Sequence, residues 1–149
     1  MDALAAGGPR MSLAASQTAA TELQSFLAFD FGQQRTGVAY ASRLLGLAQP
    51  QGTVRGSGQL KWEAISKHIA QWQPEALVVG VPYHPDGAAH DNTLQAQKFA
   101  RQLRSRFGLP VYEVDERYST TEARSLSAAD VDAASACVIL NQFLRSLDT

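Results

Sequence analysis

Three acidic positions stand out in this chain of 149 residues, because each lies where a predicted strand or helix begins or ends. Asp30 follows an apolar strand, the pair Asp115-Glu116 ends a later strand, and Asp132 lies at the start of a long apolar helix. Carboxylates from separate elements can surround a hard cation such as Mg²⁺, which prefers oxygen ligands. Two such cations can stabilise both the attacking and the leaving oxygen of phosphodiester cleavage. The pattern therefore indicates a site for divalent metal and phosphate.

All three acidic positions also have an ordinary structural explanation. Asp115-Glu116 could be a solvated strand end with a local ion pair. Asp30 could cap the turn at Gly32. Asp132 could simply complement the positive end of a helix dipole, with Asp130 as the N-cap. An ionised carboxylate on a sheet face is costly unless it is paired, metal-bound or near the sheet edge. Together the three positions therefore favour the metal site more than each does alone.

The pair Asp115-Glu116 leaves one choice open. Alternation along a strand points the two carboxylates to opposite sides. One can join a metal site while the other pairs with Arg117 or Arg35. Both acids therefore stay candidates for the site.

Other polar residues have two interpretations each. Lys98, Arg101 and Arg104 share one side of a predicted helix, which could face phosphates or be an ordinary solvated surface. Thr121 and its neighbours 119–120 could donate to a phosphate, although capping of a helix start is the first interpretation. These residues are therefore supporting candidates rather than the centre of the site.

Composition limits the class of protein. The net charge of −1 argues against a strongly basic nucleic-acid binder, so any contact with a polyanion must be local. The single cysteine, Cys137, excludes an internal disulfide and fits a reducing compartment. No apolar run reaches the roughly 20 residues of a membrane span. Residues 1–25 are expected to form a flexible extension, and 26–149 a single domain.

The apolar pattern predicts the order strand-strand-strand-helix-strand-helix-strand-helix. The strands are expected at 26–31, 36–42, 45–54, 76–81 and 110–114, and the helices around 62–72, 92–107 and 131–147, with a short helix at 120–125. Pro50 and Gly52 interrupt the third strand, which predicts an irregular or edge strand. Asn92 is the expected cap of the second helix, and Gly108 its expected end. The first three strands can form an antiparallel meander, and the later units parallel neighbours with right-handed crossovers. This α/β arrangement, a mixed central sheet with helices on both faces, resembles the RNase H-like fold. That fold gathers carboxylates from the first strand, the fourth strand and the last helix.

Several motifs together resemble the YqgF family, also called RuvX, which is similar to the Holliday junction resolvase RuvC. The matching segments are FLAFDFGQQRTGVAYA (26–41), LGLAQP (45–50), WQPEALVVGVPYHPDG (72–87), QKFARQLRSRFGLPVYEVDERYSTTEARS (97–125) and VDAASACVILNQFL (131–144). They follow the family's order and cover almost all of the chain after residue 25. The combination is specific, although each piece alone is weak.

The resemblance implies site residues and a cofactor. The acids that would hold Mg²⁺ or Mn²⁺ are Asp30, Glu116 and Asp132, with Asp115 as the competitor of Glu116. Arg35, Arg117 and Thr121 would lie near the phosphate path. One departure concerns segment 126–130, which is shorter than the family's usual Gly- and Lys-containing stretch and has no lysine. This departure affects the grip on substrate more than the acids.

The resemblance also implies a function. Family members are regarded as nucleases that process the 5′ end of the small-subunit ribosomal RNA precursor in the bacterial cytoplasm. The expected partners are precursor rRNA and the ribosome or its precursor, with no membrane, and the protein would act as a monomer or homodimer. Two alternatives use the same fold: a junction-resolving DNA nuclease, and a noncatalytic ribosome-assembly or RNA-binding module. An actin-like ATPase shares the fold but needs two such domains.

Overall fold

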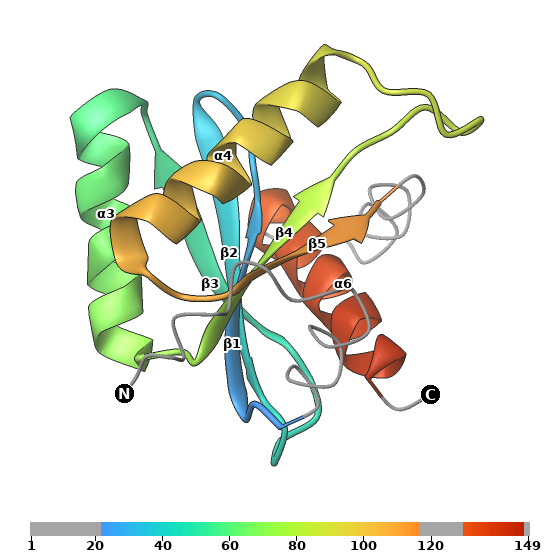
Figure 1. Ribbon diagram of the computed structural model, residues 1–149. Helices are drawn as coiled ribbons and strands as arrows, with labels where there is room; N and C mark the ends of the chain where they lie inside the picture. The colour runs from blue at the N-terminus through green and yellow to red at the C-terminus, as the bar shows by residue number, and fades with distance from the viewer. Residues whose placement is uncertain (1–21, 117–129, 148–149) are drawn as a thin grey trace.

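The computed structural model describes residues 22–116 and 130–147 (Figure 1). The strands are β1 (Ser25–Asp30), β2 (Arg35–Ser42), β3 (Gln49–Arg55), β4 (Ala76–Val81) and β5 (Val111–Asp115). The helices are α3 (Gly58–Trp72), α4 (Asp91–Phe107) and α6 (Val131–Ser146). The expected short helix at 120–125 and the expected site residues Arg117 and Thr121 lie outside the described residues, as do 126–129 of the short segment.

The strands form one mixed sheet in the order β3-β2-β1-β4-β5. The pairs β1–β2 and β2–β3 are antiparallel, and the pairs β1–β4 and β4–β5 are parallel. This confirms the predicted meander followed by parallel neighbours. It also places Asp30 at the carboxyl end of the central strand β1. The parallel strands β4 and β5 have their carboxyl ends at the same end of the sheet.

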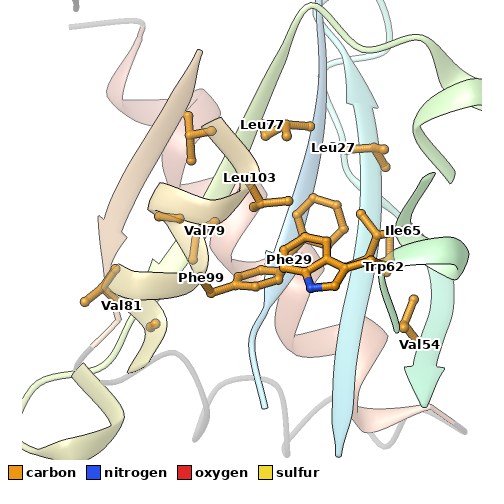
Figure 2. Close-up of a cluster of buried hydrophobic side chains, with 14 residues drawn as sticks. Leu27, Phe29, Val54, Trp62, Ile65, Leu77, Val79, Val81, Phe99 and Leu103 are labelled. Carbon is orange, nitrogen blue, oxygen red and sulfur yellow. The ribbon is translucent and has the colours of Figure 1, made fainter. Parts of the chain in front are cut away.

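The helices cover both faces of the sheet, as predicted (Figure 1). Side chains from α3 and α4 pack with alternate residues of the strands in one core, which includes Phe29, Trp62 and Phe99 (Figure 2). Helix α6 packs on the other face against Phe26 and Ala28. Because successive residues of β1 point to opposite faces, Asp30 shares the α6 face with Phe26 and Ala28.

The strand patterns account for their places in the sheet. All six residues of β4 are buried, as expected for a parallel strand covered on both faces. Strand β3 is the edge strand predicted from Pro50 and Gly52, and its pairing with β2 shifts register between Val38 and Ala39. Gly52 has φ 104, a conformation that glycine tolerates best.

Two helix ends follow their sequence signals, and one differs. Gly108 ends α4 in the left-handed conformation, and Asp130 is the N-cap of α6, where it accepts from Ala133 N at 3.0 Å. Asn92 was the expected cap of α4, but His90 holds that position. The Nδ1 of His90 accepts the Asn92 N–H at 3.1 Å, so the imidazole nitrogen replaces the usual oxygen acceptor.

The start of the domain lies close to the expected boundary. Strand β1 begins at Ser25, and Leu23 already packs on the α6 side of the core. Residues 1–21 lie outside the described part, so the division at residue 25 stays a prediction. Among the described helices, none combines the length and the apolar character that crossing a membrane requires.

Candidate active site

Asp30 is the centre of the candidate site. Its carboxylate lies on the α6 face at the end of β1, among buried neighbours. Burial raises the pKa of Asp30 first of all, the negative charge of Asp132 raises it further, and a hydrogen bond with Ser135 opposes both. A carboxyl group in this environment resists ionisation unless a positive charge joins it.

Two glycines flank Asp30 on the same face of the sheet. Gly37 is its partner across the β1–β2 pair. Gly80 follows Val79, which pairs with Phe29 across the β1–β4 pair. A Cβ atom on Gly37 would overlap the main chain of Asp132, and one on Gly80 would overlap the carboxylate of Glu116. The missing side chains therefore let both other acids approach Asp30.

The position of Glu116 separates the two candidates for the second acid. Glu116 directly follows β5, the strand end where the sequence analysis placed the pair Asp115-Glu116, although the general fold pattern named the fourth strand. Its carboxylate lies over Gly80 of β4. Glu116 is only 8% exposed, whereas Asp115 is an exposed residue. Burial raises the pKa of Glu116 most, followed by the charges of Asp30 and Asp115. Glu116 is therefore the acid on which the charge of Asp30 acts.

Asp132 lies at the first turn of α6, held by polar contacts. The Nε and Nη2 of Arg35 are each 2.7 Å from Asp132 Oδ2. The hydroxyl of Thr53, which pairs with Gly37 across the β2–β3 ladder, donates to the carboxylate oxygens of the N-cap Asp130 at 2.6 and 2.8 Å. These contacts fix the start of α6 on β2 and β3. They also show that Arg35, expected near the acids of β5 or near the phosphate, contacts Asp132.

The acids approach one another as two pairs that share Asp30, one with Asp132 and one with Glu116. Within residues 22–116 and 130–147, no three His, Cys, Asp or Glu side chains form a ready-made metal-binding group. The donor set still fits a hard divalent cation, since it consists of carboxylate oxygens and the flanking glycines let Asp132 and Glu116 approach Asp30.

The basic residues predicted to share one side of α4 differ in their contacts. Arg104 donates to Val111 O at 2.9 Å and to Glu113 at 3.4 Å, so it belongs to a local contact with β5. Lys98 and Arg101 are exposed on α4.

Sequence reasoning did not assign roles to Gly37, Gly80, Thr53 or Ser135. For Gly80, the sequence offered one signal, which is a glycine near the end of an apolar strand. This signal indicates that another group approaches the strand there, but it does not reveal that the group is Glu116.

A mixed sheet in this order, with helices on both faces, defines an α/β domain of the RNase H-like class. The family model described as "RuvX: Holliday junction resolvase" matches residues 24–146. The chain belongs to this RuvX family, which confirms the resemblance found in the sequence.

Curated relatives span nearly the same length. A protein of Polaromonas sp. (strain JS666) is 64% identical over 137 residues, covering 92% of this chain and 99% of the relative. A protein of Albidiferax ferrireducens is 61% identical over 128 residues, covering 86% of this chain and 82% of the relative. Both carry the name "Putative pre-16S rRNA nuclease".

Solved structures agree on the fold. T. thermophilus RuvC in complex with a Holliday junction substrate matches with a TM-score of 0.52 and 17% identity, covering 83% of this chain and 94% of that one. Another Thermus thermophilus RuvC structure matches with a TM-score of 0.50 and 13% identity, covering 82% and 96%. These matches confirm the predicted RNase H-like fold.

Proposed function

We propose that this protein is a metal-dependent nuclease that hydrolyses RNA phosphodiester bonds, and that its substrate is the 5′ end region of the precursor of 16S rRNA in the cytoplasm. The observation that carries the activity is the approach of three acids at one end of the sheet. Asp132 and Glu116 lie over the glycines that flank Asp30, the charge of Asp132 acts on Asp30, and the charge of Asp30 acts on Glu116. The substrate is supported by the name shared by relatives that are 64% and 61% identical to this chain.

The proposed ligands of Mg²⁺ or Mn²⁺ are Asp30, Glu116 and Asp132. The cation, when bound, supplies an activated water and neutralises charge on the phosphate. Asp30 lies at the end of a strand buried on both faces, so its backbone is rigid and its carboxylate has a fixed direction. Glu116 is held over Gly80, and Asp132 is held by the first turn of α6.

Arg35 supplies a positive charge at the same end of the sheet. Its side chain is 53% exposed, and its guanidinium lies against Asp132. A guanidinium binds a phosphate with the same two-pronged geometry that it uses for a carboxylate. We propose that Arg35 contacts the substrate phosphate when Asp132 turns to the metal.

The deciding experiment is cleavage of a precursor 16S rRNA fragment by the purified protein with Mn²⁺ or Mg²⁺. We expect Asp30→Asn and Glu116→Gln to lose cleavage and Asp115→Asn to keep most of it, because the exposed Asp115 lies outside the buried pair. Cleavage by Asp30→Asn at the parental rate would contradict the mechanism, and loss in Asp115→Asn alone would exchange the roles of the two neighbouring acids.

A second candidate function is resolution of branched DNA, which the description of the family model favours. The same acids would serve it, so the substrate decides. A four-way DNA junction is therefore tested beside the RNA, and faster cleavage of the junction would replace the proposed substrate. Binding of RNA without cleavage of either substrate would favour a noncatalytic role in ribosome assembly.

A further inference from the structure

An open pocket of about 490 Å³ lies on the other face of the sheet, between the start of α3 and the middle of α4. Its lining includes two lysines, Lys61 and Lys98, together with amide and aromatic side chains, but neither Asp nor Glu. Phe31, which follows Asp30 directly, forms part of the wall. The pocket therefore lies beside the candidate active site and is separated from it by the β1–β2 turn.

Lys61 is an unusual residue for such a wall, because it is only 6% exposed. Its Nζ lies 4.0 Å from the centre of the Phe31 ring and 5.1 Å from that of Phe99, and it donates to Gly32 O at 3.2 Å. Among the described residues, the ammonium has no carboxylate within salt-bridge distance. Burial lowers the pKa of Lys61 to about 8, so the group is still charged at neutral pH. A buried cation of this kind is stabilised by an anion that enters from the pocket.

The start of α3 adds a second positive feature to the same pocket. Ser57 is the N-cap but makes no side-chain cap hydrogen bond, and the first turn contains no acidic residue. The N–H groups of a helix start are hydrogen-bond donors with a partial positive charge. Ser57 and Gly58 both line the pocket, and the exposed Lys98 faces it from α4. Three sources of positive potential from two helices, namely the start of α3, Lys61 in its first turn and Lys98 of α4, thus meet in one concave site.

We infer that this pocket binds the sugar-phosphate backbone of the RNA strand whose scissile phosphate lies at Asp30, an inference that rests on the proposed nuclease function. Phosphate is the anion that matches a buried ammonium, a second lysine and a helix start. Asp30 lies on the α6 face, whereas the next residue, Phe31, packs with the α3 and α4 core and lines the pocket. The proposed path of the RNA strand therefore crosses the β1–β2 turn from the acids to the pocket. The hydrogen bond of 2.9 Å from Gln33 to Gln95 ties that turn to α4.

The test is the affinity of the full chain for a fluorescent single-stranded RNA, measured by anisotropy with EDTA present so that nothing is cleaved. Lys61→Met replaces the buried ammonium by an apolar side chain of similar length, and the matched control is Lys67→Met, which removes an exposed lysine of the same helix. We expect Lys61→Met to bind about tenfold or more weakly, since a charge-assisted hydrogen bond contributes that much. We expect Lys67→Met to bind within about twofold of the parent.

A second pair of variants separates the pocket from a diffuse basic surface on α4. Lys98→Gln removes the exposed lysine of the lining, and Arg101→Gln removes an exposed charge of the same helix outside the lining. When a protein gives up one phosphate of a single strand, the slope of log K against log salt becomes shallower by about 0.7. We expect that change for Lys61→Met and Lys98→Gln. An equal weakening of binding in Lys98→Gln and Arg101→Gln would overturn the pocket in favour of the surface.

The remaining outcomes keep this inference distinct from the proposed function. If Lys61→Met binds RNA with the same affinity as the parent protein, the proposed binding at the pocket is overturned, whatever the cleavage assay gives. Weakened binding in Lys61→Met together with no cleavage by the parent retains the pocket and rejects the nuclease. Inorganic phosphate is the competitor in a last arm. If phosphate binds the parent in a Lys61-dependent way while RNA does not, the site takes a free anion and the strand path is rejected.

Discussion

At the scale of single residues, the acids that the proposed function needs lower the stability of the fold when they ionise. Asp30 and Glu116 are buried carboxyls, the charge of Asp30 acts on Glu116, and both have raised pKa values. A folded acid with a raised pKa retains its proton where the unfolded chain has already lost it. The fold is thus destabilised as these groups are forced to ionise, which is a common property of sites built for catalysis.

The first prediction concerns the pH dependence of stability. Burial raises the pKa of Asp30 to about 7 and that of Glu116 to about 8, from ordinary values of 3.8 and 4.5. Between about pH 4 and pH 8 the folded protein therefore binds more protons than the unfolded chain, so its stability falls as the pH rises. We expect Asp30→Asn to be more stable than the parent at pH 8 by about 1–3 kcal/mol without metal, and nearly equal at pH 4, where the unfolded chain also retains much of its proton.

Urea unfolding at both pH values measures this difference. The control is Asp115→Asn, since Asp115 is exposed and its replacement relieves only its charge effect on Glu116. A destabilised Asp30→Asn at pH 8 would mean that the Asp30 carboxylate is already stabilised by partners in the folded protein.

The second prediction concerns Gly80, which positions Glu116 without touching substrate. In Gly80→Ala, the new methyl group would overlap the Glu116 carboxylate and the Cδ1 of Ile139, both ends of flexible side chains. We therefore expect the variant to fold and kcat to fall by up to about 10²-fold, because a displacement near 1 Å has that effect at a catalytic site.

A double-variant cycle provides the control for Gly80→Ala. If Gly80 acts through Glu116, adding Gly80→Ala to Glu116→Gln causes no further decrease of kcat. Additive decreases would show instead that the methyl group disturbs the sheet as a whole.

At the scale of elements, the contact between β2 and the start of α6 decides where Asp132 lies. Gly37 permits the main chain of α6 to rest directly on the strand. The N-cap Asp130 is bound by the Thr53 hydroxyl, so β3 also takes part. The helix start is thus joined to two strands at the level of Asp30.

The third prediction tests that contact. In Gly37→Ala the Cβ would overlap the O and C atoms of Asp132 and lie 2.9 Å from Ala133 N. These are backbone atoms of a packed helix, so they cannot give way as the side chains near Gly80 can. We expect Gly37→Ala to lower the free energy of unfolding by about 3 kcal/mol or more, measured by urea denaturation. A decrease no larger than that of Gly80→Ala would show that α6 moves freely on the sheet.

The elements themselves were largely predictable from the sequence, and their contacts were not. Apolar periodicity gave the order of the strands and helices, and the glycine signal at Gly108 placed the end of α4 correctly. The predicted cap of α4, Asn92, was wrong because the helix already begins at Asp91 and the His90 side chain accepts the Asn92 N–H. The strand end that carries Asp115-Glu116 was placed correctly. Alternation says which face a residue takes, but it could not show that the Glu116 carboxylate lies over Gly80 of the neighbouring strand.

At the scale of the whole molecule, a protein with almost no net charge is proposed to bind a polyanion. The chain carries a net charge of −1, so its overall field gives little attraction for RNA. Contacts at Arg35, Lys61 and Lys98 would therefore have to provide most of the electrostatic affinity. The protein should accordingly depend on the placement of a few cations rather than on total charge.

The last prediction concerns the stability of the whole domain with a divalent ion. A ligand that binds only the folded state stabilises it by RT ln(1 + [L]/Kd), so a concentration about ten times Kd contributes about 1.4 kcal/mol. We expect Mg²⁺ or Mn²⁺ to raise the melting temperature of the parent at pH 8 by a few degrees, because the cation removes the repulsion among Asp30, Glu116 and Asp132. Asp30→Asn should start from a higher melting temperature and gain almost nothing, and NaCl of equal ionic strength should not reproduce the parental shift. Equal shifts of the melting temperature in the parent and in Asp30→Asn would place the ion elsewhere on the molecule, because a cation bound by Asp30 would bind more weakly once that carboxylate is lost.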